Sequence, residues 1–377
     1  MKALTKALTK ALSLRLAPFA AALVALAASG LPAAARDGHE GGAYLVTNLV
    51  SDLPGVAAVT DPDLVNPWGI SFSPTGPFWL SDNGTGLSTL YNGVGVKQPL
   101  IVTIPPPVGS ADGGTPTGQV FNPTPDFVVS QGVKHGKSAF LFASEDGTIS
   151  GWSPAVNFLH ALVAVDNSAS GAVYKGLALD RVGTANFLYA ANFRAGRIDV
   201  FDKNFHPAVL AGAFQDKRIP TGYAPFNVQN VAGFLVVTYA KQDAAKHDDV
   251  AGAGHGFVDV YSSSGLLLTR LASRGPLDSP WGVALAPAGF GRFSHALLVG
   301  NFGDGRINAY DTRDGDYLGA LRGPRERPVV IDGLWGLSFG NGGAAGDTNK
   351  LYFTAGSGHE QHGLFGSIQA ASENDDD

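Results

Sequence analysis

The sequence predicts an all-β fold built from one repeated unit of short strands. A segment of the type aromatic–Gly–apolar recurs along the chain, most clearly at Trp68-Gly69-Ile70, Trp281-Gly282-Val283 and Trp335-Gly336-Leu337, with weaker copies centred on Phe127, Gly176 and Asn227. The mean spacing of these six positions is about 53 residues, a period typical of propellers and other repeat folds. A content of 50 Gly and 23 Pro also suits many short strands joined by tight turns.

Each unit divides into about four strands. In the first unit we expect them at 68–72, 77–81, 87–91 and 100–104, in the third at 176–179, 187–191, 197–201 and 208–211, and in the fifth at 282–286, 296–300, 306–310 and 317–321. The second unit is expected to begin at 125–128. Six such units predict a six-bladed β-propeller of four-stranded blades. A right-handed solenoid is the alternative, although solenoid repeats are usually shorter.

The last unit shows only three strands, at 334–339, 350–354 and 364–368. Residues 44–50 alternate as a strand, so we expect this N-terminal segment to supply the missing fourth strand of the last blade. Such a closure would remove the exposed edges of an open ring.

The N-terminus has the pattern of an export signal. Basic residues precede an apolar stretch from Leu16 to Leu31, and Ala33-Ala34-Ala35 precedes Arg36. We expect residues 1–35 to be a cleaved signal peptide, with an uncleaved anchor as the alternative. Residues 36–371 would then form one domain, and the acidic tail 372–377 would be disordered. No later stretch has the length of a membrane span. We expect the exported protein to lie in the periplasm or outside the cell, and to be a monomer.

Charge and composition exclude several function classes. Removal of residues 1–35 takes away four basic and no acidic side chains, which leaves 22 Lys and Arg against 32 Asp and Glu, a net charge of −10. Such a balance argues against nucleic acid or an anionic membrane as a partner. The chain has no cysteine, so disulfides, cysteine–zinc sites and thiol catalysis are excluded.

Strand direction predicts which residues surround the mouth of the channel. Strands alternate in direction within a blade, so the start of the first strand and the end of the second lie on one face, and the first strand lies nearest the axis. The residues that begin the first strands are Trp68, Asp126, Lys175, Phe226, Trp281 and Trp335. The aromatic members suit a flat or sugar-like ligand, or they pack as core between blades. Asp126 and Lys175 form either a structural ion pair or a polar contact for a ligand.

A second ring lies at the ends of the second strands. Its members are Asp82, Ser144, Asn192, Tyr239, Asn301 and Ala355, with Glu145 beside them. Asp82, Asn192, Asn301 and Glu145 offer oxygen ligands, and calcium takes about six to eight oxygens, so calcium is the candidate cofactor. The alternative is that Asp and Asn hold hairpin turns through their side chains.

Two other patterns carry less weight. The loops with His247, Asp248, Asp249 and His255 and with His359 to His362 lie on the same face and could hold a transition metal, or they are ordinary polar loops. Gly336-Leu337-Ser338-Phe339-Gly340 matches a nucleophile elbow by letter, but it lies inside a predicted strand and no helix follows. We interpret it as a chance match.

The segment Tyr44 to Asp52, the pair Asp61-Pro62 and the run Leu64 to Ile70 resemble an uncharacterised bacterial family of exported, NHL-like six-bladed propellers. The resemblance covers nearly all of the chain after residue 35. It implies the fold and no particular reaction. More distantly, the chain is similar to calcium-dependent lactonase propellers, whose Glu, Asn and Asp ligands surround the tunnel mouth, but it shows no full match to that ligand set.

Taken together, these patterns predict a protein that binds a small molecule or a protein partner through the mouth face. The alternative is a calcium-assisted lactonase or hydrolase of the six-bladed type, with ligands from Asp82, Asn192, Asn301 and Glu145. A structural matrix or envelope protein is a third possibility. The sequence does not decide whether the protein is an enzyme.

Overall fold

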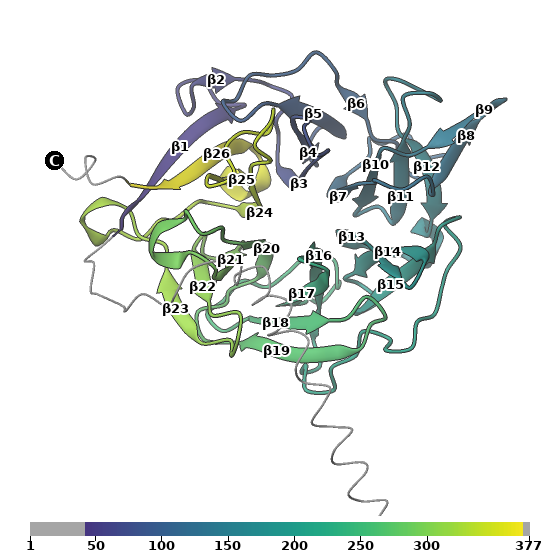
Figure 1. The fold of residues 1–377 in the computed structure, drawn as a ribbon. Helices are drawn as coiled ribbons and strands as arrows, with labels where there is room; N and C mark the ends of the chain where they lie inside the picture. Colours follow the sequence, from purple (N-terminus) through teal and green to yellow (C-terminus); the bar gives the residue numbers. More distant parts are fainter. Residues whose placement is uncertain (1–41, 372–377) are drawn as a thin grey trace, which may run out of the picture.

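The strands form a closed ring of six blades around a central axis (Figure 1). The computed structural model describes residues 42–371, and within this range the chain is almost entirely β, so the predicted six-bladed propeller is confirmed. The predicted signal peptide and the predicted acidic tail lie outside the described residues. Of the helices that the structure describes, none is long and apolar enough to cross a membrane.

In each blade the strands follow one another from the channel outward. The first blade contains β3 (Pro67–Phe72), β4 (Phe78–Asp82), β5 (Leu87–Tyr91) and β6 (Val102–Thr103). The second contains β7 (Pro116–Phe121), β10 (Phe140–Ser144), β11 (Thr148–Trp152) and β12 (Leu162–Asp166). The third contains β13 (Tyr174–Val182), β14 (Ala185–Asn192) and β15 (Arg197–Asp202).

The remaining blades follow the same order. The fourth contains β16 (Tyr223–Val231), β17 (Phe234–Lys241), β18 (Gly256–Tyr261) and β19 (Leu267–Ser273). The fifth contains β20 (Pro280–Leu285), β21 (Leu297–Asn301), β22 (Ile307–Tyr310) and β23 (Tyr317–Ala320). The sixth contains β24 (Leu334–Phe339), β25 (Leu351–Ala355) and β26 (Leu364–Ala370). Short helical turns lie at η1 (Ser168–Ser170), η2 (Gly291–Phe293), η3 (Pro324–Glu326) and α3 (Ser357–Glu360).

The N-terminal strand closes the ring, as predicted. β1 (Tyr44–Ser51) pairs antiparallel with β26, from Tyr44 opposite Ala370 to Ser51 opposite Leu364. The two-residue strand β2 (Val59–Thr60) runs parallel to β1 at the outer edge. The Tyr44 hydroxyl donates a hydrogen bond of 2.9 Å to the carbonyl oxygen of Phe290, which ties the closing strand to the fifth blade.

Two predictions of strand position were wrong. The second blade begins at β7, not at 125–128, because its copy of the repeat reads Pro116-Thr117-Gly118 and has Thr in place of the aromatic residue. Asp126 therefore does not begin an inner strand; it precedes an added hairpin, β8 (Val128–Gln131) and β9 (Lys134–Lys137). In the third blade, residues 208–211 form no strand, and Pro207 makes only an isolated bridge to Phe201.

The glycine of the repeat is explained by the contact between blades. A Cβ atom on Gly69 would lie 2.4 Å from the carbonyl oxygen of Thr117 in the next inner strand, and one on Gly282 would lie 2.4 Å from that of Trp335. The equivalent residues Gly118, Gly176 and Gly336 approach the next blade in the same way. In the fourth blade this position is Asn227, whose amide donates a hydrogen bond of 2.8 Å to the carbonyl oxygen of Trp281. The inner strands thus pack backbone against backbone around the channel.

The hydrophobic core is divided among the blade interfaces. Among the described residues, six apolar clusters each join two neighbouring blades, and a seventh fills part of the channel. Each blade is therefore buried on both faces by its neighbours, which is how a propeller satisfies apolar residues on both sides of a sheet.

Candidate functional site on the mouth face

The mouth face is the side on which the inner strands begin. Five of the six residues predicted to surround the channel there are the first or second residues of an inner strand or lie close to its start, and all five are buried: Trp68, Lys175, Phe226, Trp281 and Trp335. The sixth position belongs to Thr117, not to Asp126. In the first, fifth and sixth blades the pairing register shifts at this point, as between Pro67 and Ile70. Such a bulge redirects a side chain, here toward the channel.

Aromatic rings close the channel just below the mouth. Trp68 stacks on Trp335 with ring centroids 3.4 Å apart, and Phe302 stacks on the other side at 3.9 Å. Trp281 meets Trp335 edge-on at 5.8 Å, and Phe226 lies 5.9 Å from it. Trp68 and Trp335 are each only 1% exposed. These rings pack against one another, which supports the core interpretation over stacking with a ligand. We call these five residues the aromatic plug.

Lys175 is the one charged residue in this ring of inner-strand starts. Its ammonium group lies 4.8 Å from the centre of the Trp68 ring, a cation–π contact. The same group donates a hydrogen bond to Glu145 and lies 3.4 Å from a carboxylate oxygen of Asp248. The predicted ion pair of Lys175 with Asp126 is wrong, because Asp126 is displaced from the mouth and accepts a hydrogen bond from Asn186 instead.

A chain of hydrogen bonds extends this ion pair around the mouth. Trp335 Nε1 donates to the side-chain oxygen of Asn66 at 3.0 Å, and Asn66 donates in turn to Glu360 at 2.9 Å. In the first blade, the Asn83 amide nitrogen donates to Glu145 at 2.8 Å. The Asn83 side-chain oxygen accepts a hydrogen bond of 3.3 Å from Asn66. The polar groups above the aromatic plug therefore come from the sixth, first, second, third and fourth blades and form one network.

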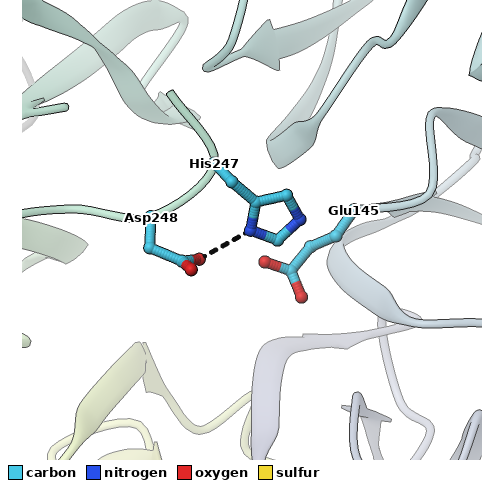
Figure 2. A group of neighbouring side chains, drawn as sticks. All are labelled: Glu145, His247 and Asp248. Carbon is cyan, nitrogen blue, oxygen red and sulfur yellow. Dashed lines mark hydrogen bonds and ion pairs between the residues drawn. The ribbon is translucent and has the colours of Figure 1, made fainter. Parts of the chain in front are cut away.

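Glu145, His247 and Asp248 form a group that could hold a metal ion. Figure 2 shows the three side chains pointing toward one another, with His247 and Asp248 on the loop between β17 and β18 and Glu145 just after β10. One ligand atom from each lies within 4.8 Å of the other two. His247 Nδ1 lies 2.8 Å from Asp248 Oδ1. Because Lys175 also contacts both carboxylates, a bound cation would share or replace its role.

The charges of the network act on one another. Burial and the nearby carboxylates of Glu145 and Asp248 raise the pKa of Glu360. Burial by itself would lower the pKa of Lys175, but the charge and hydrogen bond of Glu145, together with the charges of Asp248 and Glu360, outweigh it and hold that pKa above its ordinary value. For Asp248 the effect of burial is outweighed by Lys175 and His247, so its pKa is lowered. The result is an acidic ring around one buried ammonium group.

The other proposed calcium ligands are engaged in hairpin turns. A buried carboxylate oxygen of Asp82 accepts hydrogen bonds from the amide and hydroxyl of Thr89. The Asn192 side-chain oxygen accepts a hydrogen bond of 3.1 Å from the Ala195 amide, and the Asn301 amide donates to Asp304 at 2.9 Å. These contacts match the alternative in which Asp and Asn hold the turns. Asp82 Oδ1 and Asn301 Oδ1 are buried and have no partner among the described residues. Glu145 alone of the four joins the network at the mouth, and calcium stays a hypothesis.

The histidine loops contribute in part. His247 and Asp248 reach the site, whereas His255 bonds to the carbonyl oxygen of Val250 and His362 to Asp52. Ser338 lies on β24 and bonds to the carbonyl oxygen of Phe339, as expected of a strand residue and not of a nucleophile elbow.

The residues that sequence reasoning missed follow one simple rule. Successive side chains of a strand point in opposite directions. The strand-two ends Asp82, Asn192 and Asn301 turn into their hairpins, and the residues one position later, Asn83, Phe193 and Phe302, join the mouth network or pack in the channel cluster. The parallel segments Ala191-Asn192-Phe193 and Gly300-Asn301-Phe302 carried this signal.

Comparison with known proteins gives a family without an assigned activity. No family model matches the chain. An uncharacterised protein of Acanthamoeba polyphaga mimivirus is 35% identical over 332 residues, which span 86% of this chain and 80% of the viral protein. This chain belongs to the same family. A second uncharacterised mimivirus protein of that family is 36% identical over 332 residues, spanning 86% of this chain and 85% of its own length. Membership of a bacterial NHL-like family stays a prediction.

Solved structures share the propeller fold of this chain at low sequence identity. A protein of unknown function from Bacteroides thetaiotaomicron aligns with a TM-score of 0.50 and 11% identity, over 87% of this chain and 77% of that one. A virginiamycin B lyase from Staphylococcus aureus, in a catalytically inactive form with quinupristin, aligns with a TM-score of 0.48 and 10% identity, over 88% and 100% of the two chains. These likenesses concern the propeller fold alone.

Proposed function

We propose that the protein binds a ligand through its mouth face, and that Glu145, His247 and Asp248 together hold a cation as part of that binding. We call these three residues the cation anchor. The observation that carries the proposal is the convergence of these side chains, from two blades, above a channel closed by aromatic rings. Around Lys175, the carboxylates of Glu145, Asp248 and Glu360 outnumber the single ammonium group. An added positive charge would relieve the repulsion among them.

The donor set favours a transition metal such as zinc over calcium. One imidazole and two carboxylates suit zinc, whereas calcium takes about six to eight oxygen ligands. In a tetrahedral zinc site with bonds of about 2.0–2.2 Å, two ligand atoms lie about 3.3–3.6 Å apart. The three ligand atoms lie within 4.8 Å of one another, so they would have to move closer together by about 1 Å to bind zinc.

The calcium-assisted lactonase or hydrolase finds less support. Asp82, Asn192 and Asn301 are bonded within turns, and the aromatic plug fills the channel beside them. The proposal is therefore a binding protein. Export to the periplasm or beyond belongs to the same proposal and rests on the N-terminal pattern; a protein recovered from those compartments should begin at Arg36.

Calorimetric titration of the purified chain with zinc and, separately, calcium tests the cation anchor. We expect one zinc site, weakened at least tenfold in His247→Ala, which removes a ligand, and in Asp248→Asn, which removes the negative charge of another. His206→Ala is the matched control. His206 is exposed and lies on the turn after β15, outside the group of Glu145, His247 and Asp248. Zinc binding that is absent, or that is equal in wild type and His247→Ala, would refute the cation anchor. Tighter binding of calcium than of zinc would instead support the calcium hypothesis.

A further inference from the structure

The channel continues beyond the aromatic plug as a separate cavity. Its volume is about 360 Å³, and its walls are the later residues of the inner strands of five blades, with Trp281 from the remaining one. Trp68, Lys175, Phe226 and Trp335, which belong to the mouth, do not line it. The cavity reaches Asn230, which is exposed, so a molecule can enter from the face opposite the mouth.

The chemistry of this cavity is the opposite of that of the mouth. Of the described residues that line it, none is Asp, Glu, Lys, Arg or His; they are glycines, aliphatic and aromatic residues, serines, Asn and Gln. A charged molecule would lose part of its hydration there without gaining a counter-charge, which is unfavourable. The cavity therefore selects an uncharged occupant.

Polar atoms without partners lie in the walls. Trp281 Nε1, Gln119 Oε1 and Ser71 Oγ are buried and have no hydrogen-bond partner among residues 42–371. The amide nitrogen of Gln119 is already committed to the carbonyl oxygens of Gly69 and Trp79, so its oxygen remains as an acceptor. Trp281 can only donate, whereas the Ser71 hydroxyl can do either. Buried polar groups are rarely left unpaired. Each of the three atoms exposes less than 1 Å² of surface, so an occupant of the cavity would pair with them only after their side chains shift.

We propose that this cavity is a second binding site, for a small uncharged molecule with an apolar body and one hydroxyl or amide group. A volume of 360 Å³ holds about twelve water molecules at roughly 30 Å³ each, which sets a similar number of non-hydrogen atoms for the occupant. Because the aromatic plug separates the two sites, this proposal does not depend on the cation anchor at the mouth.

Four probes of nearly equal shape test the proposal on the full chain. Benzamide and benzyl alcohol are neutral, and benzoate and benzylammonium are charged; their dissociation constants are measured by ligand-observed NMR. We expect the neutral pair to bind at least tenfold more tightly than the charged pair. Ser338→Phe, which fills the cavity from β24, should abolish this binding, and the mouth variant Asp248→Asn should leave it unchanged.

Three results would overturn the proposal: no binding of the neutral probes, which would mean a cavity that holds water only; equal binding of neutral and charged probes; or binding that Asp248→Asn removes. If Ser338→Phe does not fold, diffraction from wild-type crystals soaked in 4-bromobenzyl alcohol decides the question. An anomalous bromine peak beside Trp281 and Gln119 supports the site, and bromine peaks only elsewhere contradict it.

Discussion

Lys175 shows how one residue can stabilise the fold and shape the site together. Its ammonium group is buried, and burial of a charge is costly unless a partner compensates for it. Glu145 and the Trp68 ring supply that compensation, and Asp248, which is largely exposed, adds less. Removing one partner of such a pair leaves the other charge buried and unpaired.

We expect Lys175→Met to lower the free energy of unfolding by about 3 kcal/mol, in the range for breaking a buried ion pair. The double variant Lys175→Met with Glu145→Gln should lose less than the sum of the single variants, because neither charge is then left alone. Urea denaturation measures all three. Lys134→Met, at an exposed position, is the control and should change stability by less than about 0.5 kcal/mol. Additive losses would show that the pair is not coupled.

The limit of sequence reasoning at this scale is a shift of one residue. The ends of the second strands were located correctly, yet Asp82 and Asn301 face their turns, whereas Asn83 bonds to Glu145 and Phe302 joins the aromatic plug. A strand alternates with a period of two, so an error of one position selects the wrong face. The network around Lys175 joins residues from several blades, and no local pattern reports such contacts.

At the scale of the element, the inner strand is the unit that the repeat encodes. The repeated glycine was visible in the sequence, but the reason for it was not. A Cβ atom at this position would clash with atoms of the next blade, and the sequence does not show which blades are neighbours in contact. The second blade was misplaced because Thr117 replaces the aromatic residue, and Pro125-Asp126-Phe127-Val128 imitates the repeat nine residues after Pro116. Phe127 instead fills the core between the second and third blades.

We expect Gly282→Ala to destabilise the protein by about 1–3 kcal/mol, the usual cost of inserting atoms into a packed interior. The new Cβ would lie 2.4 Å from the carbonyl oxygen of Trp335. Only a movement of the backbone could relieve this steric clash. Gly113→Ala is the matched control, because nothing lies within 4 Å of a Cβ there. Differential scanning calorimetry compares the two, and equal melting temperatures would contradict the proposed close contact between blades.

At the scale of the whole molecule, closure by β1 is the feature that makes six sheets one body. The strand was predictable because the last unit lacked a fourth strand and residues 44–50 alternated. The hydrogen bond from the Tyr44 hydroxyl to the fifth blade was not predictable, because it depends on how neighbouring blades pack. The overall fold could thus be read from the sequence far better than the site could.

Deletion of residues 44–50 should open the ring and expose the edge of β26. An exposed edge strand pairs readily with other chains, so we expect a lower melting temperature together with dimers or larger aggregates. Light scattering after size exclusion and a thermal melt measure both effects. Tyr44→Phe keeps the strand and should remain monomeric. A deletion variant that is monomeric and melts like the wild type would disprove the role of β1.

The pairing of β1 with β26 also sets a time order on folding. Tyr44 pairs with Ala370, so β1 must wait for a strand that is synthesised more than 300 residues later. At about 5–20 residues per second, the 326 residues from Leu45 to Ala370 take roughly 16–65 s to synthesise. During that interval the earlier blades can form but the ring cannot shut, and the segment that will become β1 carries unpaired backbone groups. A chaperone or export factor that shields an extended strand would have its natural target there.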